Sequence, residues 1–506
     1  MEASAIHPRR KASRPRTGGG GARSTVDGGK EQSPPEGRGP GFRIACDVAK
    51  DRVIGVSLAT PDKIRELQRK LYRKAKQEPT YRFYSLYDKV YRADILAHAY
   101  ALCKANAGAP GVDGQTFADI EEYGEESFVV DLECELREGT PGGSDPSEAR
   151  TFGYRPDAVR RVMIPKPDGG ERPLGIPTVR DRTVRMAAKL VLEPVFEADF
   201  TPNAHGYRPN RSALDAVKEV HRNLKAGRTH VVDADLSKYF DSIPHAELLR
   251  SVARRVSDGR ILKLIKMWLK APVEKMDDGG RPQRRGAGSQ GTPQGGVVSP
   301  LLANIYMRRF LKAWEQHGLD RQLHSRIVNY ADDFVILCRH SPERALYAAK
   351  HILGSIGLTL NETKTRTCDA WAESFDFLGY TFGRHYYFGS GKPYLGARPS
   401  DRSVKRLKDT VRKYTRLFQW SPRQVVRTVN RRVRGWTAYF SYGSLTKSYD
   451  RGEKFIQERL RRWLVGKHKM GTRGLRRYPA RFIYGHLGLI NLPNVLKTLR
   501  MPCESS

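Results

Sequence analysis

The segment Arg326–Cys338 reads RIVNYADDFVILC and places two adjacent carboxylates, Asp332 and Asp333, between two apolar runs. Apolar runs separated by a short polar break predict two strands joined by a tight turn. Two acids side by side repel each other unless positive charge lies near them, and divalent cations are their natural partners. A solvated turn is the simpler alternative, since Asp is common in turns. The pair predicts a metal site only if further acids join it.

A second acidic segment, Thr229–Ile243, reads THVVDADLSKYFDSI. Apolar residues lead into Asp233 and Asp235, and these two acids share one face of the predicted strand because side chains alternate along it. A third carboxylate can therefore approach the pair at the turn. Three oxygen ligands suit Mg²⁺, and nucleotidyl transfer uses two such ions about 3.5–4 Å apart. The spacing predicts a site for that chemistry.

Further motifs follow in a fixed order. Tyr330–Asp333 (YADD) resembles the YxDD box of reverse transcriptases, and Asp235–Asp241 (DLSKYFD) resembles their first palm motif. The other motifs are RRVMIPKPDGGERPLGIP (160–177), GYRPNRSALDAV (206–217), GTPQGGVVSPLLANI (291–305), GLTLNETKT (357–365), FLGY (377–380) and RGWTAYF (434–440). This ordered series closely resembles group II intron-encoded reverse transcriptase/maturases over roughly residues 61–495. Each box alone is weak, and the set is highly specific.

The resemblance implies an α+β right-hand polymerase, with fingers and a palm built from an antiparallel sheet plus helices, and a helical thumb. It divides the chain into a disordered basic tail (1–60), an N-terminal helical extension (61–150), reverse transcriptase fingers and palm (151–390), and a helical thumb/maturase RNA-binding domain (395–495). A Gly- and Ser-rich piece at 136–158 is expected to be an inserted loop. No paired cysteines follow Val495, so an HNH-type endonuclease is expected to be absent.

The same resemblance assigns roles to individual residues. Asp235, Asp332 and Asp333 would be catalytic and, with Leu236, would hold two Mg²⁺ ions, for which Mn²⁺ could substitute. The residues expected to bind the dNTP are Arg161, Lys166, Arg172, Phe240, Gln294, Gly295 and Lys364. The expected primer grip consists of Phe377, Leu378, Gly379 and Tyr380.

Two of these assignments compete with structural explanations. Phe240 would lie against the sugar C2′ position and disfavour ribonucleotides. Packing in the core is the alternative explanation, and the two are not exclusive. The cations of the hairpin at 160–177 could hold a triphosphate. A solvated basic hairpin is the alternative.

Between Lys275 and Gly296 the sequence predicts a Gly/Arg loop.

The charge balance indicates the class of partner. The chain has 506 residues, with 90 Lys and Arg against 55 Asp and Glu, a net charge of +35. Such an excess points to a polyanion, and nucleic acid is the first interpretation. No run of 18 apolar residues occurs, so a membrane partner is not expected. Six scattered cysteines without a CxxC pair indicate reduced, mostly buried thiols in a cytosolic protein. The expected location is cytoplasmic, of bacterial type and associated with the nucleoid or RNA.

The basic residues are concentrated near the C-terminus. Residues 401–500 hold 26 Lys or Arg and only five Asp or Glu. Apolar spacing predicts one helix whose stripe ends at Phe418, and a second helix after the cap pair Ser421-Pro422. One face of the second helix carries Arg423, Arg427, Arg431 and Arg434. A solvated face usually mixes signs, so a stripe without acids predicts binding to an RNA or duplex backbone.

The resemblance and the charge together predict an RNA-directed DNA polymerase that also assists intron splicing and mobility. Its expected partners are the group II intron RNA, an RNA template with a DNA primer, dNTP and target DNA. The leading alternative is a reverse transcriptase of the same lineage co-opted for defence or repair without an intron. A further alternative is an RNA-binding maturase with a silent palm, which the complete acidic set disfavours.

Overall fold

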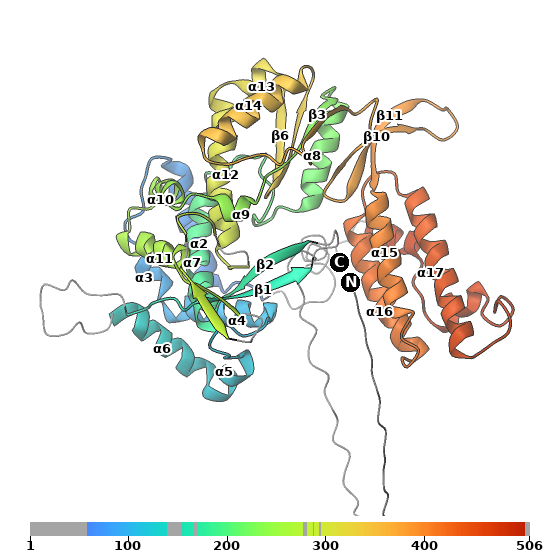
Figure 1. Cartoon of the computed structure of the whole chain (residues 1–506), viewed down its shortest axis with the longest axis horizontal. Coiled ribbons are helices and arrows are strands. Elements are labelled where there is room, and N and C mark those ends of the chain that lie inside the picture. Colours follow the sequence, from blue (N-terminus) through green and yellow to red (C-terminus); the bar gives the residue numbers. More distant parts are fainter. Residues whose placement is uncertain are drawn as a thin grey trace, which may run out of the picture. The chain divides into compact units, whose positions relative to one another are not determined.

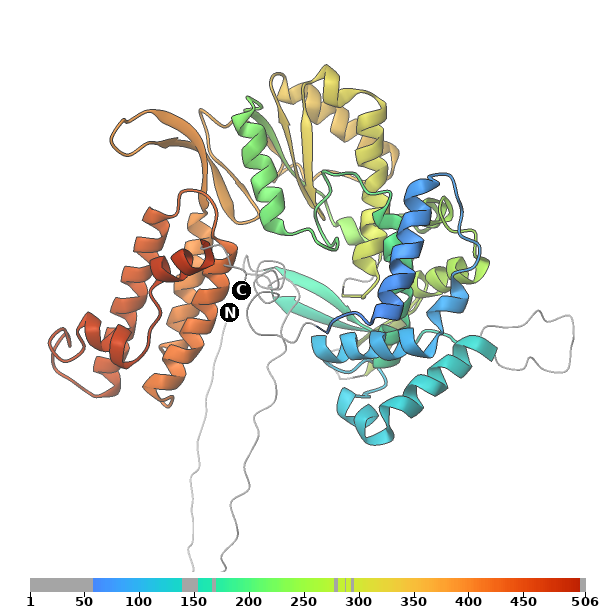
Figure 2. The same cartoon turned by 180° about the vertical axis from the view of Figure 1, so that it is seen from behind.

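The computed structural model describes residues 58–138, 153–165, 170–276, 281–286, 288–292 and 295–500 (Figures 1 and 2). Nearly all of the expected tail, most of the expected inserted loop, Lys166 and Gln294 lie outside these residues. Within the described ranges no helix is long and apolar enough to cross a membrane. Helices and sheets occur together, in agreement with the predicted α+β class.

Helices dominate the first part of the described chain. The first helix after Pro61 buries Ile64, Leu71 and Ala75. Arg92 is extended, and a new helix begins after it. The elements are α2 (Asp62–Gln77), α3 (Tyr87–Val90), α4 (Ala93–Asn106), α5 (Phe117–Tyr123), α6 (Glu125–Glu138) and α7 (Val179–Glu197).

A four-stranded sheet in the order β2-β1-β4-β5 contains the basic hairpin. Strands β1 (Val159–Pro165) and β2 (Glu171–Ile176) pair antiparallel, as the sequence predicts. Strand β4 (Val273–Met276) runs parallel to β1, and β5 (Pro282–Arg285) is antiparallel to β4. The prediction of an uninterrupted loop after 275 is therefore wrong. Polar residues and a proline form β5 because an edge strand needs neither an apolar face nor a full set of donors.

The central sheet has the order β6-β7-β3-β8 and is antiparallel throughout. Its strands are β6 (Arg326–Tyr330), β7 (Asp333–Cys338), β3 (His230–Asp235) and β8 (Arg366–Asp369). One face packs on α12 (Ser299–Gln316) and α14 (Pro342–Ser355), and the other packs on α8 (Ala213–Lys225) (Figure 1). Burial on both faces explains why β7 reads as an apolar run without alternation. The shorter helices of this region are α9 (Tyr239–Ser242), α10 (His245–Ala253), α11 (Gly259–Leu269) and α13 (Leu319–Gln322).

A third sheet joins the central sheet to the C-terminal helices. Strands β9 (Phe375–Phe377), β10 (Tyr380–Tyr386) and β11 (Pro393–Pro399) pair antiparallel in the order β11-β10-β9. Their buried residues, including Phe375 and Phe382, belong to the same apolar cluster as α8. That cluster also contains Tyr439 and Phe440 from the RGWTAYF motif.

The C-terminal helices are α15 (Asp401–Tyr414), α16 (Pro422–Tyr439), α17 (Thr446–Lys467) and α18 (Leu492–Arg500), with a short π-helix, η2 (Phe482–His486). Ser421 caps α16 through a capping box with Gln424, and Pro422 occupies the first turn, as predicted. The apolar stripes of α15 and α16 are buried in one cluster with residues of α17 and α18. Phe418 is an exception, because α15 ends before it and its side chain is 51% exposed.

Candidate active site

The acidic hairpin folds as the sequence predicts. Tyr330 pairs with Asp333, so Ala331 and Asp332 form a two-residue turn between β6 and β7. Ala331 has φ of +60°, a left-handed conformation that residues other than Gly adopt infrequently. The Asn329 side chain donates a hydrogen bond of 2.8 Å to the Ala331 carbonyl and so stabilises this turn.

Strand β3 brings the third predicted acid to the hairpin. In the register of β3 and β7, Asp235 lies directly opposite Asp333, next to the turn that carries Asp332. Directly opposed residues in an antiparallel pair have Cβ atoms about 4.5–5.5 Å apart. Asp233 lies two residues earlier on the same face and pairs with Val335. The structure thus gathers Asp235, Asp332 and Asp333 where β3 ends and β7 begins, and we call this end of the central sheet the acidic edge.

Burial and mutual repulsion raise the pKa values of these acids. Desolvation by the surrounding protein and the neighbouring carboxylates of Asp332 and Asp235 raise the pKa of Asp333 to about 7. The pKa of Asp332 is raised by the same two kinds of cause, burial and the charge of Asp235. Burial also raises the pKa of Asp233 to about 6, although Arg366 opposes this shift. Like charges held together in this way need positive charge to remain ionised.

Two cations lie beside these acids. The Lys364 ammonium group is 3.0 Å from Oδ2 of Asp235. Arg172, on β2 of the basic hairpin, is close enough to lower the pKa of Asp332. Both were predicted to contact the dNTP, and the structure places both at the acidic edge.

The arrangement fits divalent cations by the chemistry of its donors, since carboxylate oxygens are the preferred ligands of Mg²⁺. In the described part of the chain, no group of three His, Cys, Asp or Glu side chains already converges as a metal site. The backbone brings the three acids together, and their side chains would have to reorient to hold a cation in common. Leu236, which the resemblance assigns to the metal site, forms an isolated bridge with Leu360. The hydrogen bonds of this bridge use the carbonyls of Asp235 and Thr359 and leave that of Leu236 aside.

A segment that sequence reasoning did not assign supports the turn from behind. A Cβ built on Gly206 would lie 2.5 Å from the Ala331 nitrogen, so the backbone at Gly206 packs directly on the turn. The Asn304 side chain of α12 donates a hydrogen bond of 2.7 Å to the Gly206 carbonyl. His205 N donates to the Asn329 carbonyl at 2.9 Å. A polar Asn304 within an otherwise apolar helical stretch is the signal that could have identified this support.

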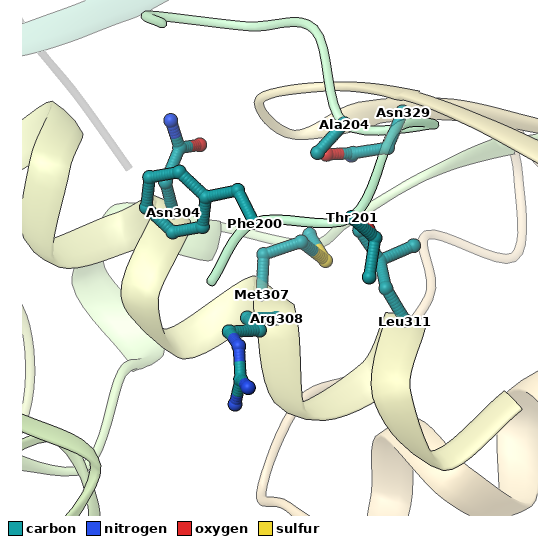
Figure 3. A pocket seen from close by; sticks show the side chains of 8 residues that line it. All are labelled: Phe200, Thr201, Ala204, Asn304, Met307, Arg308, Leu311 and Asn329. Carbon is teal, nitrogen blue, oxygen red and sulfur yellow. The ribbon is translucent and has the colours of Figure 1, made fainter. Parts of the chain in front are cut away.

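Figure 3 shows a space beside Asn329, the β6 residue whose side chain bonds to the turn. Asn304 and Asn329 both line it, together with apolar side chains from α12 and from the segment after α7. The space is too narrow for a water molecule. Asn329 and Asn304 therefore lie in closely packed protein, which limits their movement.

The remaining predicted dNTP residues occupy varied environments. Arg161 is exposed on β1 and pairs with Gly175. Gly295 has φ of +101°, and a Cβ there would lie 2.7 Å from the Gly175 carbonyl, so it approaches β2 closely. Phe240 is only 6% exposed and packs edge-on against Tyr207. Core packing thus explains why Phe240 is buried. Its role in excluding ribonucleotides stays a prediction.

The predicted primer grip is a tight turn held by the C-terminal helices. Phe377 pairs with Tyr380, which leaves Leu378 and Gly379 as a two-residue turn, both with positive φ. The Tyr439 hydroxyl donates to the Leu378 carbonyl at 2.7 Å. The Ser403 hydroxyl donates to the Gly379 carbonyl at 2.9 Å. Side chains of α15 and α16 therefore fix this turn.

The arginine stripe on α16 is exposed along its length. The apolar residues Val425, Val429 and Val433 are buried on the opposite side of the helix. No ion pair joins the stripe to a carboxylate of the described residues. The four exposed side chains are Arg423, Arg427, Arg431 and Arg434.

Two protein-family models match the chain. A model described as reverse transcriptase (RNA-dependent DNA polymerase) matches residues 164–382, which contain the three acids. A model described as group II intron, maturase-specific domain, matches residues 404–479, which contain α16.

Curated proteins are also similar. Protein YkfC of Escherichia coli (strain K12) is 32% identical over 363 residues, 63% of this chain and 87% of that protein. The group II intron-encoded protein LtrA of Lactococcus lactis subsp. cremoris is 32% identical over 231 residues, 46% of this chain and 35% of LtrA. An uncharacterized 91 kDa protein in the cob intron of Schizosaccharomyces pombe is 28% identical over 400 residues, 64% of this chain. The match covers 48% of that last protein, so the chain spans about half or less of two of these relatives.

Among solved structures, the chain is similar to telomerase from Candida albicans in complex with a TWJ fragment of telomeric RNA. The alignment has a TM-score of 0.38 and 14% identity, and it covers 68% of this chain and 62% of that chain.

Proposed function

The chain belongs to the family of group II intron-encoded reverse transcriptases with a maturase domain, and we propose that it copies RNA into DNA by two-metal nucleotidyl transfer and binds its intron RNA to assist splicing and mobility. The predicted enzyme class, RNA-directed DNA polymerase, is confirmed by the reverse transcriptase match. Binding of nucleic acid templates and intron RNA follows from the same two domains. The metal ions, dNTP, target DNA and individual residue roles are the proposed part.

The observation that carries the proposal is the pairing of Asp235 with Asp333 beside Asp332. Together these acids would hold two Mg²⁺ ions, which would lower the pKa of a primer 3′-hydroxyl and stabilise the leaving pyrophosphate. The raised pKa values of Asp332 and Asp333 support this assignment, because added positive charge would return both groups to their ionised state.

The cations at the acidic edge would hold the triphosphate. Phosphoryl transfer depends mainly on position and charge, so fixed donors near the phosphates suffice and no protein nucleophile is needed. Arg172 approaches from the basic hairpin, and Lys364 approaches from the segment after α14. We expect Lys364 to release Asp235 when the metal ions and the nucleotide bind. Gly295 and Phe240 would then border the base and the sugar of the incoming nucleotide.

The turn at Leu378 and Gly379 would position the primer strand. Because Tyr439 and Ser403 hold both carbonyls of this turn, primer placement depends on the C-terminal helices. The arginine stripe of α16 would contact RNA phosphates without reading sequence, since guanidinium groups pair with phosphate oxygens. Intron binding by this surface is a binding function and needs no metal site.

The experiment separates polymerisation from splicing. We expect the double variant Asp332→Asn with Asp333→Asn to lose cDNA synthesis on a primed RNA and to retain splicing of a flanking intron. Asp62→Asn is the matched control, because the Asp62 side chain is 98% exposed and lies on α2. Persistent cDNA synthesis in the double variant would show that the site is wrongly assigned. If the wild-type protein makes cDNA but assists no intron, the co-opted reverse transcriptase becomes the better explanation.

A further inference from the structure

The hairpin of β10 and β11 carries an aromatic tip that no role above explains. Tyr386 is 59% exposed, Tyr387 is 56% exposed, and Phe388 is fully exposed. Tyr387 N donates to the Lys392 carbonyl at 3.0 Å, which closes a four-residue loop with Phe388 as its first residue. Large apolar side chains exposed together on a protein surface usually mark a binding site.

Aromatic rings cover both faces of this hairpin. On one face Tyr394 packs against two rings, that of Tyr387 with centroids 4.3 Å apart and that of His385 with centroids 5.6 Å apart. Residues alternate between faces along a strand, so Tyr386 lies on the opposite face. There the Arg384 guanidinium lies 5.8 Å from the Tyr386 ring.

The base of the hairpin is fixed, whereas the tip is exposed. Phe382 stacks on Phe375 in the buried cluster, with ring centroids 5.2 Å apart. His221 Nε2 lies 3.1 Å from the Leu395 carbonyl, and the Ser444 amide donates to the Ala397 carbonyl at 2.7 Å. In both cartoon views the hairpin extends as an arm from its sheet (Figures 1 and 2). Because these contacts hold its base, the hairpin loses less conformational freedom on binding than a loop without them would.

The charges around the tip indicate which class of ligand it binds. Residues 383–394, which form the outer part of the hairpin, contain no Asp or Glu, and their cations are Arg384 and Lys392. Exposed aromatic rings interleaved with cations and free of acids form a surface on which unpaired bases stack while phosphates meet positive charge. Binding to a protein partner or to a membrane surface would explain the exposed rings. It would not explain why cations without acids lie beside them in a nucleic-acid enzyme.

We propose that the aromatic tip formed by Tyr386, Tyr387 and Phe388 is a second RNA-binding site that stacks on unpaired bases. The site is distinct from the three acids, because it lies on the sheet of β9, β10 and β11 and the acids lie on the central sheet. The unpaired bases come either from a loop of the folded intron RNA or from the single-stranded template. The inference rests on the proposed role of the chain as an RNA-binding polymerase.

The test compares two labelled RNAs of equal length, a stem with a large unpaired loop and a blunt duplex, by fluorescence anisotropy with the full chain. Stacking on aromatic side chains changes affinity by about tenfold or more per base. We expect the triple variant Tyr386→Ser, Tyr387→Ser and Phe388→Ser to bind the looped RNA at least about tenfold more weakly and the duplex unchanged within about twofold.

Two further variants test whether the loss of binding comes from the aromatic tip itself. Phe388→Ala removes the fully exposed ring alone, so it leaves the fold intact, and we expect a smaller loss in the same direction. Tyr347→Ser is the matched control, because Tyr347 is 75% exposed on α14, and we expect no change. Unchanged binding of the looped RNA by the triple variant and by Phe388→Ala would overturn the proposal. An equal loss for the duplex would overturn it too, because the tip would then not distinguish unpaired bases.

Further arms identify the source of the bases and separate this proposal from the preceding one. If the template supplies them, cDNA synthesis of the triple variant drops on a structured template and not on an unstructured one. If the intron supplies them, both cDNA reactions stay normal and intron binding weakens. Wild-type protein that makes no cDNA but shows the predicted loss on looped RNA would refute the polymerase proposal and retain this one. Wild-type protein that makes cDNA, together with a triple variant that binds the looped RNA normally, would retain the polymerase proposal and refute this one.

Discussion

Substituting Gly206→Ala tests whether close packing behind the acidic turn sets the geometry of the active site. The added Cβ would lie 2.5 Å from the Ala331 nitrogen and 3.0 Å from the Tyr330 carbonyl carbon. Comfortable contact between such atoms needs about 3.5 Å, so the two backbones must separate by about 1 Å. The segment cannot move freely, because Asn304 holds the Gly206 carbonyl and His205 N bonds to Asn329. The turn that carries Asp332 must therefore shift.

The expected effect is large on catalysis and moderate on stability. A misplacement of about 1 Å in a catalytic group costs roughly 10²-fold in rate. Forcing one extra methyl group into a packed interior costs about 1–3 kcal/mol of stability. We expect kcat for dNTP incorporation on a primed RNA to fall by about that factor while the melting temperature falls by only a few degrees. Primer-extension kinetics and thermal unfolding measure the two effects.

Gly259→Ala is the control for this substitution. A Cβ at Gly259 meets nothing within 4 Å, and the residue begins α11, where alanine favours the helix. This variant should keep full activity and equal or greater stability. A Gly206→Ala protein with wild-type kcat and normal folding would refute the idea that the close approach at Gly206 determines where the acidic turn lies.

Three further outcomes are expected. Lys364→Ala should raise KM for dNTP several-fold with little change in thermal stability, because exposed ion pairs contribute only about 0–1 kcal/mol; an unchanged KM would argue against a triphosphate contact. Asp332→Asn with Asp333→Asn should raise the melting temperature in metal-free buffer, since it removes the like charges that raise both pKa values; a lower melting temperature would contradict this. Burial lowers the pKa of His221, so the unfolded chain binds the extra proton first, and stability falls as pH drops below about 6.5. His221→Gln should therefore show a shallower loss of stability between pH 8 and pH 5.5 in urea unfolding, and an identical slope would count against the assignment.

Much of the local structure follows from the sequence. The strand–turn–strand at 326–338, the helices after Pro61 and Ser421, and the buried stripe of α16 all follow from periodicity and from capping residues. These signals are local, because a few neighbouring side chains determine which backbone conformation buries the apolar ones. Strand β5 was missed for a related reason: an edge strand of polar residues carries no periodicity.

The sequence by itself determined which residues carry charge, where strands and helices form, and that an acidic pair follows an acidic strand. Only the tertiary structure decided that Asp235 faces Asp333, that Arg172 and Lys364 approach these acids, and that Gly206 and Asn304 support the turn. It also decided that Tyr439 holds the turn at Leu378. Register and close approach depend on packing between segments far apart along the chain. Periodicity along one segment cannot report that packing.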